Sequence, residues 1–254
     1  MTQQEALFEY TIRLGDTSLI LGHRMSEWCG HGPKLEQDIA LINIALDLVG
    51  QARSYLEYAG KIEGKGRDED KLAYFRDERN FKNLLITERP NGDWGHTIMR
   101  SFLFDTFHYY FLHELVKSKD EQLAAIAAKS LKEVTYHLRH NSEWVIRLGD
   151  GTDESHKRMV DALEELWMYT GEMFDMDEVD QQLIDAGIAP DLSKIKPLWQ
   201  QKVKEILAEA TLEYPSDDAW MQSDGKLKGI HSEHMGFILA EMQHIPRSHP
   251  EATW

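Results

Sequence analysis

The sequence lacks most features that mark secreted or membrane proteins. Cys29 is the only cysteine, so no disulfide can form within the chain, and nothing indicates an oxidising compartment. The longest apolar stretch, residues 39–49, is interrupted by Asn43 and Asp47 and is too short to cross a bilayer. The first residues lack the basic and apolar regions of a signal peptide. We therefore expect a cytoplasmic protein.

Positive charge is also scarce. The chain has 28 Lys and Arg residues against 44 Asp and Glu residues, which gives a formal net charge of −16. A surface of this charge repels phosphate backbones and anionic lipid, so we expect no nucleic-acid and no membrane partner. A cationic protein partner is compatible with it. Hydrophobic residues make up 42% of the 254 residues, which is enough for a sizeable buried core.

Proline and glycine are rare inside long segments of the chain. No proline lies between Pro33 and Pro90 or between Pro90 and Pro190, and the glycines cluster where long helices would end. The intervening periodicity predicts helices at roughly 5–28, 35–60, 93–118, 121–148 and 154–174, with shorter ones near 194–212 and 230–243. Residues 67–89 are predicted to form a connection with at most short helical turns. Since no linker divides the chain, we expect one domain over residues 1–254.

Two of the predicted helices are unusually apolar. Residues 39–49 and 98–112 are apolar on nearly every side, which is typical of central helices that are covered all round. With two other long helices they predict an all-α fold, a long four-helix bundle with additional C-terminal helices. We interpret the apolar and aromatic stripes as core packing.

Polar residues interrupt the apolar pattern of each long helix. Burying carboxylates is costly unless each one meets a metal or a cation, so inward acids on several helices indicate a dinuclear carboxylate site, present or lost. The interrupting residues are Asp16 in the first helix, Asn43, Asp47 and Gln51 in the second, Asp105 and His108 in the third, and Glu133, Tyr136 and His137 in the fourth.

The pattern of these residues does not match a complete metal site. A ferritin-like di-iron centre takes one carboxylate from each of two helices and a Glu-x-x-His pair from each of the other two. The four long helices contain no such pair, and Asp105-x-x-His108 is the nearest approach. Glu133 is followed three residues later by Tyr136, while Leu48 and Gln51 stand where a Glu and a His are wanted. We therefore expect no metal in this chain.

Protein groups are then expected to replace the lost metal. In this interpretation the degenerate metal-site positions are Asp16, Asp47, Leu48, Gln51, Asp105, Glu133 and Tyr136. The buried acids Asp47, Asp105 and Glu133 would be neutralised by cations chosen from Arg13, Lys132, His108 and His137. The alternative is a self-sufficient di-metal oxidoreductase or metal-binding bundle that uses Asp105, His108, Glu133 and His137.

Three other features have both a chemical and a structural interpretation. Cys29 could be a thiol nucleophile, but a lone cysteine at a helix end is usually structural. His231-x-x-His234 with Glu241 has a spacing compatible with a metal, although a helix start after Gly229 explains these residues as capping or surface contacts. The acid-rich run 153–180 is a solvated face or a contact for a basic partner.

Six motifs, spread over the whole chain, closely resemble those of the C subunits (PaaC) of bacterial phenylacetyl-coenzyme A epoxidase. They are Arg13-Leu14-Gly15-Asp16, Glu27-Trp28-Cys29-Gly30-His31, residues 46–53, residues 76–83, residues 132–139 and Gly229-x-His231-Ser232-Glu233-His234-x-Gly236. The resemblance implies a ferritin-like subunit that lacks metal ligands and supports a homologous catalytic A subunit, which carries the di-iron site. With a reductase and small accessory subunits, such a complex epoxidises the aromatic ring of phenylacetyl-CoA in aerobic phenylacetate breakdown.

The resemblance also suggests where this chain touches the coenzyme A tail. The first candidate is the segment Asn80-Phe81-Lys82-Asn83, which Arg76 and Arg79 flank, and the weaker one is Gln181-Gln182-Leu183. Ordinary polar connections are the alternative for both segments. A helical scaffold for an unrelated partner stays open as another function.

Overall fold

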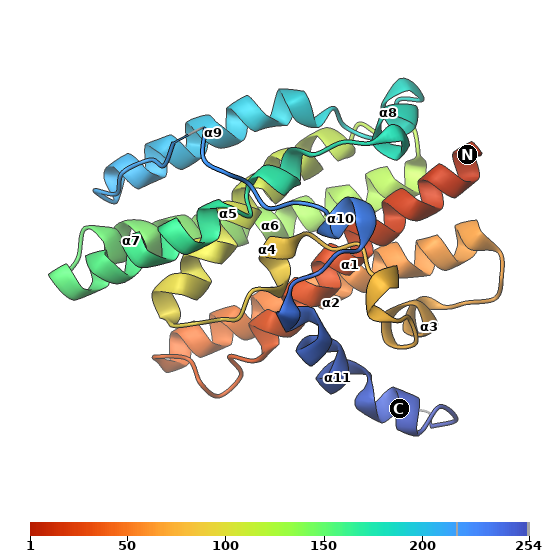
Figure 1. Ribbon diagram of the computed structural model, residues 1–254, viewed down its shortest axis with the longest axis horizontal. Helices are drawn as coiled ribbons and strands as arrows, with labels where there is room; N and C mark the ends of the chain where they lie inside the picture. Colours follow the sequence, from red (N-terminus) through yellow and green to blue (C-terminus); the bar gives the residue numbers. More distant parts are fainter. Residues whose placement is uncertain (217, 253–254) are drawn as a thin grey trace. The chain divides into compact units, whose positions relative to one another are not determined.

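The computed structural model describes residues 1–216 and 218–252, and every regular element in these ranges is a helix (Figure 1). The predicted all-α, ferritin-like class is confirmed. Its long helices have 24, 29, 22 and 29 residues. The elements are α1 (Gln3–Ser26), α2 (Leu35–Glu63), α3 (Glu69–Tyr74), η1 (Glu78–Asn80), α4 (Leu85–Glu88), α5 (Trp94–Leu115), α6 (Glu121–Gly149), α7 (Asp153–Trp167), η2 (Gly171–Phe174), α8 (Glu178–Asp185), α9 (Leu192–Glu209), α10 (Gly225–Lys228) and α11 (Glu233–Ser248).

Most predicted helix ends lie within a few residues of the observed ones. α7 is shorter than predicted, because it ends at Trp167 and the chain continues through a turn into η2. α8 was not predicted, since its 8 residues are too few for a periodic signal. The side chain of Asp177 accepts the backbone N–H groups of Val179 and Asp180 at its start.

Contacts divide the chain into two compact units. Unit 1 contains residues 1–90, 177–185 and those from 224 onward, while unit 2 contains residues 91–176 and 186–223. The prediction of a single domain over residues 1–254 stays a prediction. Unit 1 is built on α1 and α2, with α3, α4, α8 and α11 packed against them. In unit 2, α5 packs against α6, α7 and α9.

Close approach between α1 and α2 depends on two small residues of α1. A Cβ atom on Gly15 would lie 2.7 Å from Leu56 Cδ2, and one on Gly22 would lie 3.0 Å from Val49 Cγ2. Gly15 stands between Arg13 and Asp16, so the same turn of α1 that allows this packing also carries two charged side chains. The packing fixes where those charges lie in unit 1.

The helix α2 departs from its predicted environment. Leu35, Ile39 and Leu46 are 71%, 50% and 64% exposed, and Ile42 and Val49 are half-buried. These five residues, here called the α2 stripe, follow the i, i+4, i+7, i+11, i+14 spacing of one helix face. The expectation that residues 39–49 are covered on all sides is wrong for this chain by itself. By contrast, α5 is buried along nearly its whole length, as predicted.

Among the described residues, the helices are either too short or too polar to span a membrane.

Candidate functional site

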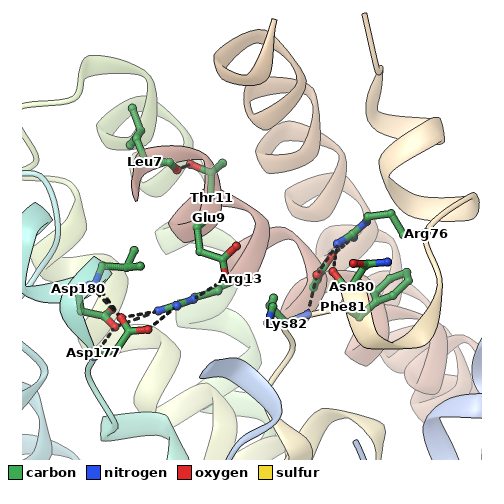
Figure 2. A network of polar contacts seen from close by, with 12 residues as sticks. Leu7, Glu9, Thr11, Arg13, Arg76, Asn80, Phe81, Lys82, Asp177 and Asp180 are labelled. Atoms are coloured by element: carbon green, nitrogen blue, oxygen red, sulfur yellow. Dashed lines mark hydrogen bonds and ion pairs between the residues drawn. The ribbon is translucent and has the colours of Figure 1, made fainter. Parts of the chain in front are cut away.

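Asp16 on α1 is fully buried and paired with an arginine. Arg76 donates to both carboxylate oxygens of Asp16, and the Nη1–Oδ2 distance is 2.9 Å. The backbone N–H of Lys82 donates to the same Oδ2 atom at 2.8 Å, and the Arg76 guanidinium lies 4.2 Å from the centre of the Phe81 ring (Figure 2). Asp16 therefore uses its oxygens to hold residues 76–82. An arginine stands where a metal would have to bind.

Arg13, one turn earlier on α1, holds a second segment. Its Nη2 lies 2.6 Å from Asp177 Oδ2 and its Nη1 lies 3.1 Å from Asp180 Oδ2, while Glu9 approaches Nε at 3.4 Å (Figure 2). Burial would raise the pKa of Asp177, but the hydrogen bond and charge of Arg13 hold it well below its usual range. Arg13 thus neutralises acids at the start of α8, and its expected role toward Asp47, Asp105 or Glu133 was wrong.

Glu88 and His231 form a third buried pair in unit 1. Glu88 Oε2 lies 3.4 Å from His231 Nδ1, both side chains have no exposed surface, and Glu88 Oε1 accepts the Ser232 N–H at 3.0 Å. The Nε2–H group of His231 donates to the Phe81 carbonyl at 3.0 Å. Burial alone would lower the pKa of His231, but the hydrogen bond and charge of Glu88 raise it above its usual value. His231 is therefore directed at protein groups, which supports the structural interpretation of His231-x-x-His234.

These pairs hold the backbone of residues 79–82, here called the anchored loop. Arg76 donates to the Asn80 carbonyl at 2.8 Å, His231 to the Phe81 carbonyl, and the Lys82 N–H donates to Asp16. Gly229 lies so close that a Cβ atom there would be 2.5 Å from the carbonyl oxygen of Arg79. Its φ of +64° is also one that glycine adopts readily.

One side chain of the anchored loop points into the interior, and the others lie at the surface. Phe81 is fully buried, whereas Arg79 and Asn80 are exposed and Lys82 is half-buried. The buried Asn83 follows, and it donates to Leu84 O from inside the unit. Of the residues predicted to contact coenzyme A here, Asn80 and Lys82 are thus placed to reach a ligand. The side chains of Phe81 and Asn83 are not, because they fill the interior.

The weaker candidate segment lies within α8. Leu183 is fully buried, Gln182 is half-buried, and the exposed Gln181 donates to Asp185 at 2.8 Å. Because Arg13 binds the start of α8 while Asp16 binds the anchored loop, two residues one turn apart on α1 fix both candidate segments. The sequence alone does not indicate this connection between the two segments.

The polar cluster of unit 2 contains Asp105, His108, His137 and Asn141, all of which are buried. Asn141 Nδ2 donates to Asp105 Oδ2 at 2.7 Å. Burial raises the pKa of Asp105 to about 6, although His137 and Asn141 act in the opposite direction. Burial likewise lowers the pKa of His108 to about 3. His137 was expected near Asp105, but the amide of Asn141 was not.

Three of the other degenerate metal-site positions, Asp47, Glu133 and Tyr136, are less buried than expected, whereas Leu48 and Gln51 are buried. Asp47 is half-buried, and Glu133 is 20% exposed with its Oε1 atom 3.9 Å from Lys129 Nζ. Tyr136 is 40% exposed and packs against His140, with ring centres 6.0 Å apart. The expectation that Asp47 and Glu133 are buried acids was wrong, and Lys132, a cation proposed for them, is exposed.

The donor chemistry of these positions does not fit a di-iron group. Leu48 has no ligating atom, Gln51 offers an amide, Tyr136 is turned toward solvent, and Asp16 is held by Arg76. Across residues 1–216 and 218–252 there is no grouping of three His, Cys, Asp or Glu side chains able to hold a metal ion. One Glu-x-x-His pair, Glu241 and His244, lies outside the four long helices, but both residues are exposed on the surface of α11.

Comparison with known proteins gives the family. The family model described as "phenylacetic acid catabolic protein" matches residues 1–254. The chain belongs to this family. It is 49% identical over 248 residues to the C subunit of the 1,2-phenylacetyl-CoA epoxidase of Escherichia coli (strain K12), and the match covers 98% of this chain and 99% of that protein.

Membership in the phenylacetic acid catabolic family confirms the resemblance carried by the six motifs. The structure adds that three of them meet, because residues 76–83 are joined to residues 13–16 through Asp16 and Arg76, and to residues 229–236 through Phe81 and His231. Glu88, which completes the contact with His231, lies outside all three motifs. The signal in the sequence that could have indicated Glu88 is its position as a single acid directly after residues 84–87, which the structure shows to be buried.

Proposed function

We propose that this chain is the structural, non-catalytic subunit of a multicomponent di-iron monooxygenase that epoxidises the aromatic ring of phenylacetyl-CoA. The proposal is supported by membership in the phenylacetic acid catabolic family and by 49% identity to the C subunit of a 1,2-phenylacetyl-CoA epoxidase. In this proposal a homologous catalytic subunit holds the di-iron site. A reductase and small accessory subunits complete the complex, which works in the cytoplasm in aerobic phenylacetate breakdown.

The observation that carries the supporting role is the α2 stripe. Its five apolar residues extend over 15 residues of helix, so the first and the last lie about 21 Å apart along the axis at 1.5 Å per residue. Contiguous exposed apolar surface of this kind marks protein–protein contacts in soluble proteins. Obligate interfaces bury about 2,000 Å² or more and are rich in apolar residues. A long helix of the catalytic subunit is the occupant that matches a straight apolar stripe.

The anchored loop supports a contact with the coenzyme A tail. Arg79 and Lys82 place two cations, and Asn80 an amide, on a backbone that buried pairs hold from beneath. Cations and amides on a fixed backbone suit phosphate groups, which coenzyme A carries in its nucleotide part. Gln181 and Gln182 stay the weaker candidates. The thioester end of the substrate would then lie in the catalytic subunit.

Iron chemistry is assigned to the partner in this proposal. The di-iron group would supply oxygen activation there, whereas the residues at the corresponding positions of this chain do not fit it. The alternative of a self-sufficient di-metal protein uses Asp105, His108, Glu133 and His137. It is disfavoured because Asp105 is engaged by Asn141 and Glu133 lies beside Lys129.

The test is co-purification of this chain with the catalytic subunit after a charge is placed in the α2 stripe. We expect the double variant Ile39→Lys, Leu46→Lys to fold but to lose the partner, because burying two lysines in an apolar interface is costly. Phe237→Lys is the matched control, since Phe237 is a 70% exposed apolar residue of the same unit on α11. Retention of the partner by the double variant would contradict the assignment, as would full activity of the catalytic subunit alone.

A further inference from the structure

The segment that joins α10 to α11 lies directly beneath the anchored loop. A Cβ atom on Gly229 would lie 2.5 Å from the carbonyl oxygen of Arg79 and 3.1 Å from that of Phe81, and His231 donates to the Phe81 carbonyl. The contact joins positions 150 residues apart in the chain. Asp16, Arg76 and His231 hold the loop backbone, and of these three residue types histidine is the one whose usual pKa lies near physiological pH.

We propose that His231, held by Glu88, is a positioning residue that fixes the anchored loop for binding the phosphate groups of coenzyme A. The proposal rests on the coenzyme A contact of the proposed function. Holding the Phe81 carbonyl keeps Phe81 in the interior, and its neighbours Asn80 and Lys82 are then directed outward. If that hydrogen bond is lost, the loop can rotate about Phe81 and the cations lose their common orientation.

The positions of Glu88 and Phe81 also indicate which protonation state of His231 holds the anchored loop best. His231 Nδ1 lies 3.4 Å from Glu88 Oε2, and Nε2 lies 3.0 Å from the Phe81 carbonyl oxygen, so a doubly protonated ring turns one N–H group toward each of these two acceptors. Loss of a proton leaves a lone pair facing one of these acceptors. The charged groups around the ring are Glu88 on α4, Glu78 on η1, and Arg24 of α1, which donates to the Glu88 carbonyl. Affinity for coenzyme A should therefore fall as the pH rises through the pKa of His231.

The experiment measures coenzyme A binding to the complex of this chain with its catalytic partner, by titration calorimetry. We expect His231→Leu to weaken the affinity roughly five- to tenfold, since it removes a hydrogen bond made by a charged donor. Steady-state kinetics should show a raised KM for phenylacetyl-CoA at unchanged kcat. The KM for phenylacetyl-pantetheine, which lacks the nucleotide phosphates, should not change. His244→Leu, an exposed histidine on α11, is the matched control.

Two further variants separate the possible failures. If Arg79→Ala with Lys82→Ala leaves coenzyme A binding unchanged, the proposed contact itself is wrong. If that variant weakens binding but His231→Leu does not, the contact stands and the positioning role is overturned. An equal loss for phenylacetyl-CoA and phenylacetyl-pantetheine would also overturn it. If His231→Leu fails to fold, His231→Gln takes its place. In the native complex we expect the affinity to decline as the pH rises, and His231→Gln should remove that decline. A decline that persists in His231→Gln contradicts the proposal.

Discussion

In unit 1, Arg13, Asp16 and Glu88 are buried beside groups of opposite charge, whereas in unit 2 Asp105 and His108 are buried in surroundings that disfavour their charge. Ion pairs of unit 1 connect helices to segments far away in the sequence. The hydrogen bond of Asp105 only joins the neighbouring helices α5 and α6. Short irregular segments have little apolar surface to bury, so directional charged contacts fix them, while packed helices do not need such contacts.

The largest expected effect comes from breaking a pair in unit 1. Asp16→Ala leaves the Arg76 guanidinium buried without its carboxylate, and it removes the acceptor of the Lys82 N–H. We expect the free energy of unfolding to fall by about 3–5 kcal/mol, measured by denaturant titration. Glu9→Ala on the same helix removes only a half-buried partner and should cost less than about 1 kcal/mol. Equal losses in the two variants would mean that the buried pair does not hold the segment.

A smaller, pH-dependent effect is expected in unit 2. His108 has a pKa of about 3 in the folded protein and near 6.5 when unfolded, so the folded protein favours its neutral form. The stability that this gives is present above pH 6.5 and is lost as the pH falls. Each pH unit between these values removes up to about 1.4 kcal/mol. In denaturant titrations at pH 7.5 and pH 5, His108→Leu should lose less stability on acidification than the native protein does. Identical pH dependence in both proteins would show that His108 does not titrate in this way.

The smallest effect is expected from making Asp105 permanently neutral. Its folded pKa of about 6 lies above the usual value of 3.8, so its favourable contribution is present below pH 3.8 and is lost as the pH rises through 6. The free energy of unfolding of Asp105→Asn should therefore differ from that of the native protein by less than about 1 kcal/mol at pH 5. At pH 7.5 the variant should become more stable relative to the native protein than it is at pH 5. A large loss at pH 7.5 would instead show that ionised Asp105 is needed, as the expectation of a buried ion pair requires.

The sequence predicts the helices well and their environment less well. The bounds of α1, α2, α5 and α6 follow from apolar periodicity and from glycine and proline at their ends. The same periodicity could not show that the α2 stripe is open, because an apolar residue looks alike whether its own chain or a partner covers it. Among short elements, α8 has too few residues to show a period.

The candidate site is likewise only partly predictable from the sequence. The acids and histidines of the long helices could be chosen from sequence, because polar residues interrupt an apolar pattern there. Their partners could not, since Arg76 is 60 residues from Asp16 and His231 is 143 residues from Glu88. The inward turn of Phe81 and Asn83 also depends on contacts with distant segments, so a polar loop in the sequence seemed more accessible than it is.

The central claim is that this chain supports a di-iron partner without holding the metal itself. Elemental analysis for iron tests it directly, applied to the purified chain and to its complex with the catalytic subunit, alongside an assay of phenylacetyl-CoA epoxidation. The account predicts that the isolated chain, even after incubation with ferrous iron, carries no stoichiometric iron and has no activity, and that both appear with the catalytic subunit. About two iron atoms per chain in the isolated protein, the number for a dinuclear site, would contradict it.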